Sequence, residues 1–228
     1  MRLLLLRHGQ THGNTAGALD TAVPGLDLTP LGVRQAEAAA RVLHESGVDG
    51  IYVSPLVRTQ QTAAPLAALT RAEPVVLDGI REISAGDYEM ATDQDSILGY
   101  IGTVADWIEG RLDTRMAGGE TGHEFLARYD AAVDQIAADR RKRAVLVSHG
   151  AAIRTWISQR VNGSASHEKA LSGLENTAAI ELDGSPADGW DIVMWTDDAL
   201  GGAYLEDETA PDPTGAAIDG DADHTPAG

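Results

Sequence analysis

The sequence predicts an α/β fold, a three-layer α/β/α sandwich with a mostly parallel central sheet. Four short aliphatic runs, at 2–6, 50–54, 74–77 and 143–148, alternate with longer segments whose apolar residues recur at helical spacing. The runs lack polar alternation, which is typical of strands that are buried on both faces and joined through helices. The 228 residues with 43% hydrophobic side chains suffice for one domain with its own core.

Two of the predicted helices carry start signals. Thr29 before Pro30 offers an N-cap hydroxyl and a proline at the first helical position, and Thr121 with Glu124 matches a capping box. A last strand is predicted at 189–195, at an edge of the sheet. The apolar faces of the two helices are predicted at Ala36, Ala39, Ala40 and Leu43, and at Leu126, Tyr129, Val133 and Ile136.

The chain divides into a domain over residues 1–205 and an acidic tail over 206–228. The tail contains seven Asp or Glu, no Lys or Arg and almost no large apolar residue. Such a segment buries too little surface to offset its ordering entropy, so we expect it to be disordered. Within the domain, a helical insert at about 90–117 is a candidate lid. Its residues Trp107, Ile108 and Leu112 would either line that lid or pack in the core.

Composition limits the classes of partner and chemistry. The formal net charge of −18 disfavours nucleic acid and anionic membranes as partners. The first apolar run is too short for a membrane span and lacks a small-residue cleavage site, so we expect a cytoplasmic protein. Without cysteine or an HxH or HExxH spacing, we expect neither a metal nor another cofactor. The oligomeric state stays open, with a homodimer as one option.

Polar residues follow four predicted strands at the end where open parallel sheets bind their ligands. Arg7 and His8 follow the first strand, Arg58 lies four residues beyond the second, Glu82 follows the third and His149 follows the fourth. Each residue alone is more simply explained as structural or ion-paired. Because they converge on one edge of the sheet, we expect them to form a single catalytic site.

The motifs around these residues resemble the histidine phosphatase superfamily, also called the phosphoglycerate mutase-like family. The resemblance extends from Arg2 to about Ala179, and its specificity lies in six elements that occur in the family's order. The elements are Arg7-His8-Gly9-Gln10-Thr11 with Asn14, Leu28-Thr29-Pro30-Leu31-Gly32, Ser54 to Thr62, Glu82 to Glu89, Gly118 to Thr121, and Ser148-His149-Gly150.

The resemblance implies a role for each candidate residue. His8 would be a nucleophile that becomes phosphorylated, and Glu82 the general acid. The phosphoryl group would be bound by Arg7, Arg58 and His149, with Asn14 assisting. Elementary chemistry agrees, because guanidiniums match phosphate oxygens and stabilise the transition-state charge without a metal. The same cations disfavour protonation of His8, so its ring should stay neutral and nucleophilic.

Three functions are compatible with the resemblance. The first is a metal-independent phosphomonoester hydrolase of the histidine acid phosphatase type, acting through phosphohistidine on a small phosphorylated metabolite. The second is a cofactor-dependent phosphoglycerate mutase, and the third a non-catalytic phosphate-binding scaffold. Mutases of the family carry a basic segment after the general acid, whereas residues 83–118 are acidic and contain Arg111 and Arg115 as their only basic residues. We therefore expect the phosphatase branch. The scaffold is a minor alternative, because all five catalytic candidates are present.

Overall fold

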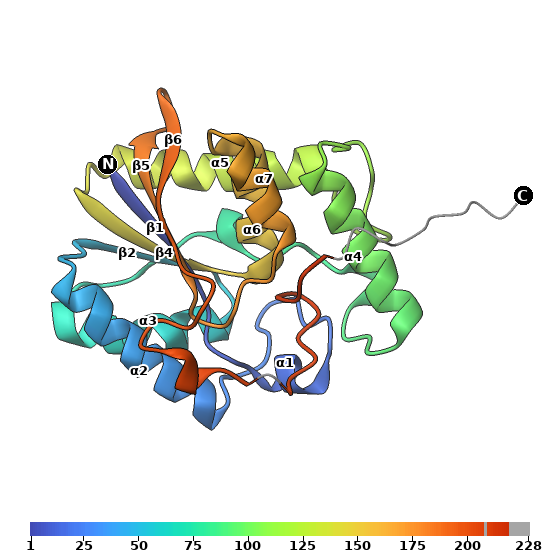
Figure 1. Ribbon diagram of the computed structural model, residues 1–228, viewed down its shortest axis with the longest axis horizontal. Helices are drawn as coiled ribbons and strands as arrows, with labels where there is room; N and C mark the ends of the chain where they lie inside the picture. The colour runs from blue at the N-terminus through green and yellow to red at the C-terminus, as the bar shows by residue number, and fades with distance from the viewer. Residues whose placement is uncertain (208, 219–228) are drawn as a thin grey trace, which may run out of the picture.

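The computed structural model describes residues 1–207 and 209–218 and confirms the predicted three-layer architecture (Figure 1). Its central sheet has the strand order β3-β2-β4-β1-β5-β6. The four strands from β3 to β1 are parallel, β5 runs antiparallel to β1, and β6 runs antiparallel to β5. The strands are β1 (Arg2–Arg7), β2 (Gly50–Val53), β3 (Val75–Val76), β4 (Arg143–Ser148), β5 (Ala179–Ser185) and β6 (Gly189–Trp195).

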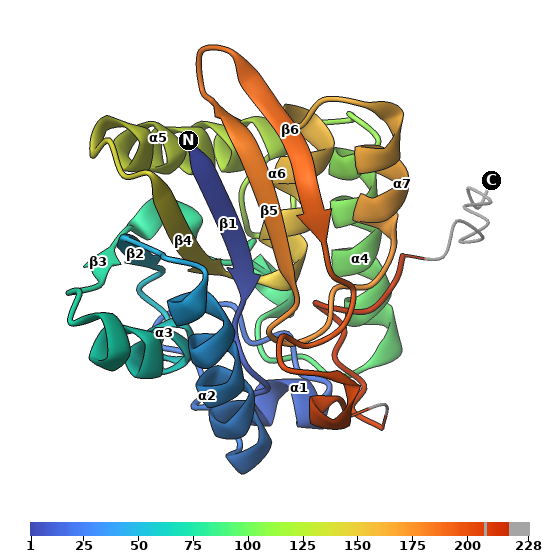
Figure 2. The same ribbon diagram turned by 60° about the vertical axis from the view of Figure 1, so that its left-hand side comes forward.

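Helices cover both faces of the sheet (Figure 2). On one face lie α2 and α3, and on the other lie α5 and α6, with α4 and α7 beside α6. Among the described residues, no helix has both the length and the apolar character needed to cross a bilayer. The helices are α1 (His12–Ala16), α2 (Pro30–Glu45), α3 (Val57–Thr70), α4 (Gln94–Ile108), α5 (Gly122–Ala138), α6 (Gly150–Arg160) and α7 (Ser164–Leu171), with 3-10 turns η1 (Asp78–Ile80), η2 (Gly86–Tyr88) and η3 (Ala203–Leu205).

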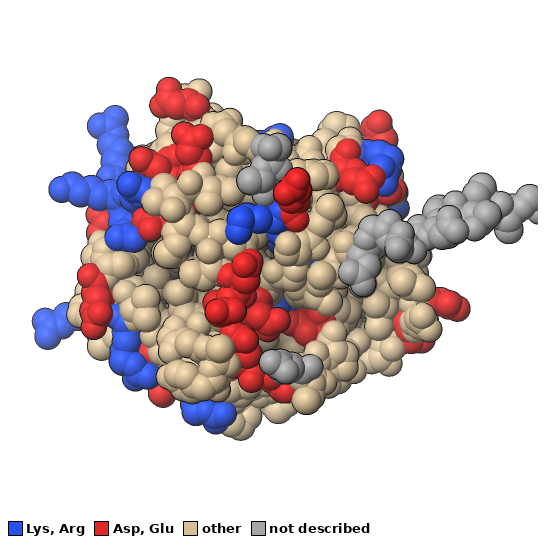
Figure 3. All heavy atoms as spheres, viewed as in Figure 1, with Lys and Arg blue, Asp and Glu red and all other residues tan. Residues whose placement is uncertain are grey.

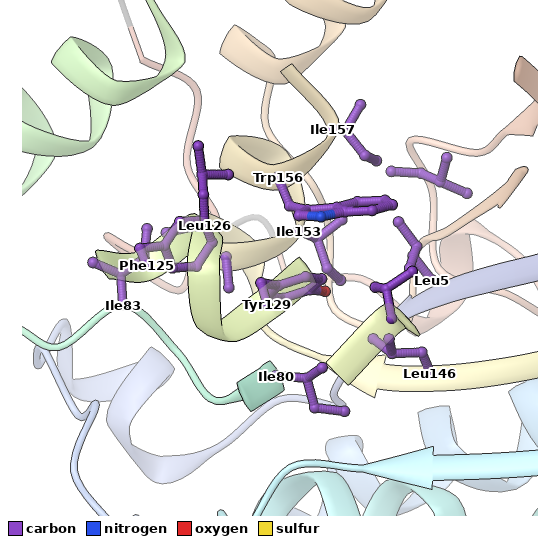
Figure 4. Close-up of a cluster of buried hydrophobic side chains, with 14 of the residues drawn as sticks. Leu5, Ile80, Ile83, Phe125, Leu126, Tyr129, Leu146, Ile153, Trp156 and Ile157 are labelled. Carbon is purple, nitrogen blue, oxygen red and sulfur yellow. The ribbon is translucent and has the colours of Figure 1, made fainter. Parts of the chain in front are cut away.

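Strand β1 shows why the core has two halves. Leu4 and Leu6 pack with the helices α2 and α3, whereas Leu3 and Leu5 pack on the other face. There Leu5 belongs to the same cluster as Trp156 of α6 (Figure 4). None of the four leucines is more than 2% exposed. The unbroken apolar run therefore reflects burial of alternate side chains on opposite faces of the sheet.

The predicted starts of α2 and α5 are confirmed by their caps. Thr29 Oγ1 accepts a hydrogen bond from the Gly32 amide at 3.0 Å, and proline occupies the first turn of α2. At α5, the Glu124 amide donates to Thr121 Oγ1 at 3.2 Å, and the Thr121 amide donates to a Glu124 carboxylate oxygen at 2.8 Å. Strand β6 lies at the sheet edge as predicted, while β5 was not predicted.

The described part of the predicted acidic tail differs from the expectation of disorder. The Asp212 amide donates to the Asn14 carbonyl at 3.2 Å, and the Ile218 amide donates to the Leu171 carbonyl at 2.8 Å. In Figures 1 and 2 this segment, in red, runs beside α1. Main-chain and charged contacts hold it, and composition does not reveal such contacts. Residues 208 and 219–228 of the predicted tail lie outside the described residues.

Trp107 belongs to the core rather than to a lid. Its side chain is fully buried and stacks on Phe125 with the ring centroids 5.9 Å apart. Its indole Nε1 donates to the Thr114 carbonyl at 2.8 Å. Ile108 is buried in the same cluster, and Leu112 packs against its margin. Of the two hypotheses for these residues, the packing favours the core.

We expect Trp107→Ala to lower the free energy of unfolding by roughly 3–5 kcal/mol, because it leaves a cavity beside Phe125. Urea unfolding followed by circular dichroism measures this change. Leu98→Ala, on the same helix but 52% exposed, is the control and should change stability by less than about 0.5 kcal/mol. A comparable loss in both variants would contradict the assignment of Trp107 to the core.

Candidate active site

The register of the sheet brings the two predicted histidines together. Strands β1 and β4 are neighbours, with Arg7 opposite Ser148, so the next residues along each chain emerge side by side. The imidazole centroids of His8 and His149 lie 5.2 Å apart in an edge-to-face arrangement. The amide of His8 also donates to the Ser148 carbonyl at 3.1 Å. Neither ring is more than 1% exposed.

A close backbone approach holds the loop that follows β1. A Cβ atom at Gly9 would lie 2.7 Å from the Gly32 carbonyl oxygen, and one at Gly32 would lie 2.1 Å from the Gln10 carbonyl oxygen. Both distances are below normal van der Waals contact, so both positions require glycine. Thr29 Oγ1 further donates to Gln10 Oε1 at 2.7 Å. The sequence elements that contain Gly9 and Gly32 are therefore packed directly against each other.

The environment of His8 favours a nucleophile at Nε2. Its Nδ1 lies 2.8 Å from the Gly9 carbonyl oxygen, which only accepts hydrogen bonds, so Nδ1 carries the proton. The lone pair is then on Nε2. Burial, with the positive charges of Arg58 and Arg7, lowers the pKa of His8 well below its usual value. The ring is therefore neutral at physiological pH.

Arg58 is buried in the first turn of α3 and is held by Asp20. Its Nη2 donates to the Asp20 carbonyl at 2.9 Å, and its Nη1 lies 3.3 Å from the Asp20 carboxylate. Its Nε is buried and has no hydrogen-bond partner among the described residues. An arginine anchored in this way keeps one donor available for an anion.

Arg7, at the end of β1, likewise donates to a main-chain carbonyl and to a carboxylate. Its Nη1 donates to the Leu174 carbonyl at 2.6 Å, and its Nη2 donates to Asp212 Oδ1 at 2.7 Å. Its Nε is likewise buried without a partner in the described part of the chain. Both predicted phosphate-binding arginines thus retain an unpaired Nε–H.

His149 is oriented by Ser54. The imidazole Nε2 lies 2.8 Å from Ser54 Oγ, while Nδ1 is buried and lacks a partner within residues 1–207 and 209–218. Burial and the charge of Arg58 lower the pKa of His149 well below its usual value. If Ser54 donates to Nε2, the neutral ring presents Nδ1–H as a donor to a phosphate oxygen.

Glu82 has one occupied and one unoccupied carboxyl oxygen. Its Oε1 accepts hydrogen bonds from the amides of Ile83 and Ala152, each at 2.9 Å. Its Oε2 is buried without a partner in the described structure. Burial raises the pKa of Glu82, against the opposing effect of these amides and of Arg58. A carboxyl group with a raised pKa and one unbonded oxygen suits a proton donor.

Asn14 completes the predicted set. Its Oδ1 accepts from the Thr11 amide at 2.8 Å in the capping box of α1, which orients the side chain. Its Nδ2 donates to Asp212 Oδ1 at 2.7 Å. Asn14 is 5% exposed and is the most exposed of the six predicted residues, so the structure describes a closed site. No group of three or more His, Asp or Glu suited to a metal ion occurs among the residues that the structure describes.

Comparison with known proteins identifies the family. Residues 3–198 match the model of the histidine phosphatase superfamily (branch 1). The chain belongs to this family. The resemblance found in the sequence is thereby confirmed, and the roles given to the six residues stay predictions that the geometry supports.

Three relatives illustrate the breadth of the family. The PE-PGRS family protein PE_PGRS11 of Mycobacterium tuberculosis (strain H37Rv) is 36% identical over 218 residues, which is 88% of this chain but 37% of that protein. The probable phosphoglycerate mutase GpmB of Proteus mirabilis is 32% identical, over 88% of this chain and 97% of its own. The solved structure of a mycobacterial glucosyl-3-phosphoglycerate phosphatase complexed with VO3 has a TM-score of 0.71 at 29% identity, covering 85% and 98%.

Sequence reasoning missed the contacts that other residues make to the predicted site residues. Ser54 was part of a recognised motif, but its hydrogen bond to His149 was not predicted. Asp20 gave no signal, because it reaches Arg58 from a loop 38 positions earlier. Asp212 was placed in a tail without contacts, yet it bonds to both Arg7 and Asn14.

The lowered pKa values of His8 and His149 predict a dependence of stability on pH. The unfolded chain binds protons on both rings below about pH 6.5, whereas the folded chain does not, so stability falls as the pH decreases from 7 to 5. Each histidine contributes up to about 1.4 kcal/mol per pH unit. Urea unfolding at several pH values gives the free energy of unfolding as a function of pH. Between pH 7 and 5 the slope of this curve should be smaller for His8→Ala than for wild type, by the equivalent of about one bound proton. An unchanged slope would contradict a neutral, buried His8.

Proposed function

We propose that this histidine phosphatase is a metal-independent phosphomonoester hydrolase of the histidine acid phosphatase type that acts on a small phosphorylated metabolite. One observation carries the proposal. The buried polar atoms that lack a partner in the described part of the chain include Arg7 Nε, Arg58 Nε, His149 Nδ1 and Glu82 Oε2, which belong to four of the residues predicted as catalytic. Buried polar groups normally have partners, so this cluster of exceptions is a binding site for an anion and its leaving group.

The first step transfers the phosphoryl group to the protein. The His8 Nε2 lone pair forms a bond to phosphorus as the ester P–O bond breaks. Glu82 Oε2 gives its proton to the departing oxygen, so a neutral alcohol leaves. The Nε–H groups of Arg7 and Arg58 stabilise the charge on the phosphoryl oxygens. The Gly9 carbonyl keeps the Nδ1 proton and so stabilises the positive ring of the phosphohistidine.

The second step hydrolyses the phosphohistidine. Glu82 is now ionised and takes a proton from a water molecule, whose oxygen bonds to phosphorus while the P–N bond breaks. His8 returns to its neutral form and inorganic phosphate is released. Glu82 keeps the proton that it took from water and can donate it in the next cycle. Positive charge on the two guanidiniums serves in place of a metal ion throughout.

Surface pairing of the two arginines in the insert favours a phosphatase over a mutase. Arg111 is 55% exposed in its side chain and pairs with Asp106 and Glu109. Arg115 is 57% exposed and lies 3.1 Å from Glu124. Both positive charges are thus occupied at the surface, which leaves neither to hold the second acidic group of a bisphosphate. The mutase is the second candidate, since a relative carries that name.

The name of the mycobacterial relative suggests glucosyl-3-phosphoglycerate as one candidate substrate. Phosphoglycerates, phosphoserine and sugar phosphates complete a test panel. The panel decides between the two candidate functions, because a mutase would interconvert phosphoglycerates and release little phosphate from other esters.

His8→Ala should abolish phosphate release from every ester of the panel, because no nucleophile remains to form the phosphohistidine. The assay is colorimetric detection of phosphate in the presence of EDTA, with wild-type protein alongside. His123→Ala, whose ring is 63% exposed, is the control and should retain full activity. Wild-type activity that disappears in EDTA, or that persists in His8→Ala, would contradict the proposal.

Glu82→Gln should affect poor leaving groups far more than good ones. We expect kcat to fall about 100-fold or more with an alkyl phosphate and less than about tenfold with 4-nitrophenyl phosphate, whose phenolate leaves without a proton. With the alkyl ester, wild-type activity should decline as the pH rises through the raised pKa of Glu82. Glu37→Gln, at an exposed position of α2, is the control. Equal losses on both esters would exclude Glu82 as the acid.

A further inference from the structure

We propose that residues 209–218, here called the C-terminal strap, inhibit the enzyme by holding the Asp212 carboxylate where a phosphate oxygen of the substrate would bind. The inference rests on the proposed function, since it assigns the strap to the same phosphate site. Asp212 Oδ1 accepts hydrogen bonds from Arg7 Nη2 and Asn14 Nδ2, both at 2.7 Å. Arg7 and Asn14 are two of the residues predicted to bind the phosphoryl group, and they converge on one carboxylate oxygen.

A carboxylate is a credible substitute for phosphate at this position. Guanidiniums and amides donate to carboxylate and phosphate oxygens with similar geometry. The second carboxylate oxygen, Asp212 Oδ2, lies 2.6 Å from Arg7 Nη2. The side chains of Arg7 and Asp212 are 1% and 14% exposed, so the pair is largely shielded from solvent and is not an ordinary surface salt bridge.

The strap is anchored on both sides of Asp212. Arg154 of α6, 1% exposed, donates from Nη1 to the Ala216 carbonyl at 2.9 Å and from Nη2 to the Thr214 carbonyl at 3.3 Å. The Leu174 amide donates to the Gly215 carbonyl at 2.9 Å. Arg154 has no part in the proposed chemistry, and these contacts give it the role of holding the strap closed.

The strap backbone lies directly against the guanidinium of Arg7. A Cβ atom at Gly215 would lie 1.9 Å from Arg7 Nη1, so no side chain larger than hydrogen fits there. A substrate that reaches Arg7 from this side must therefore displace the strap. Figure 3 shows acidic side chains gathered near the middle of the face along which the strap runs in Figure 1, which adds an electrostatic barrier to anions.

Phosphate can accept hydrogen bonds from more donors of the site than Asp212 does, which makes the inhibition reversible. The carboxylate engages Arg7 Nη2 and Asn14 Nδ2, while Arg7 Nε, Arg58 Nε and His149 Nδ1 stay without a partner in the described structure. A phosphate dianion has more charge and more oxygens, so it satisfies donors that one carboxylate leaves unpaired. Substrate then shifts the equilibrium from the closed to the open strap.

The test compares Asp212→Asn and Asp212→Ala with wild-type protein. The control is Asp191→Asn, which removes one negative charge at an exposed position of β6. Using 4-nitrophenyl phosphate, both Asp212 variants should lower KM, and the inhibition constant of inorganic phosphate, by at least about fivefold with kcat nearly unchanged. Asp191→Asn should match wild type. An unchanged or higher KM, or a loss of kcat, would overturn the inference and assign Asp212 to the positioning of Arg7.

Two further measurements separate this inference from the proposed function. In hydrogen exchange of the full-length wild-type protein, saturating inorganic phosphate should speed exchange in residues 209–218, whereas unchanged or slower exchange would overturn the strap. Calorimetric binding of inorganic phosphate needs no turnover. If Asp212→Asn binds phosphate more tightly than wild type but wild type hydrolyses no ester, the strap is supported and the phosphatase is refuted. If wild type hydrolyses esters but the two proteins bind phosphate equally, the phosphatase is supported and the strap is refuted.

Discussion

The pairing of β1 with β4 is the constraint on which the rest of the site depends. Since Arg7 lies opposite Ser148, a shift of one residue along either strand would separate His8 from His149 and turn alternate side chains to the opposite face. Leu3 to Leu6 prevent such a shift, because each of them is buried against helices on its own side of the sheet. The geometry of the candidate site and the two halves of the core are therefore set by the same register.

Burial of so many polar groups is tolerated because the protein neutralises or anchors each one. The two histidines stay uncharged, and the guanidiniums of Arg7 and Arg58 donate to main-chain carbonyls and to carboxylates. Glu82 accepts two amide hydrogen bonds. Arg7 Nε, Arg58 Nε, His149 Nδ1 and Glu82 Oε2 lack a partner among the described residues, and the proposed phosphate ester would supply one. The site thus holds its donors in place before the substrate arrives, which is the main requirement for stabilising a phosphoryl transition state.

Asp212 links the acidic C-terminal region to the positively charged site. A net charge of −18 repels anions in general, yet two buried arginines create a local positive site. One carboxylate of the acidic C-terminal region occupies this local site, and a buried arginine of α6 holds the surrounding backbone. Binding of a small phosphate ester would then combine attraction to the buried arginines with competition from the Asp212 carboxylate.

The sequence by itself determined the α/β class and the starts of α2 and α5, and it predicted the six candidate site residues, because these depend on local signals. Buried strands have apolar runs, caps have hydroxyls, and residues such as Arg7 and His149 directly follow their strands. Only the tertiary structure revealed the contacts between residues that are far apart in the sequence. Asp20 and Ser54 became supports for Arg58 and His149, Trp107 entered the core, and Asp212 reached Arg7 across 205 positions. Such contacts leave no periodicity or composition to detect, since a single hydrogen-bonding side chain looks the same in a sequence whether or not it has a partner.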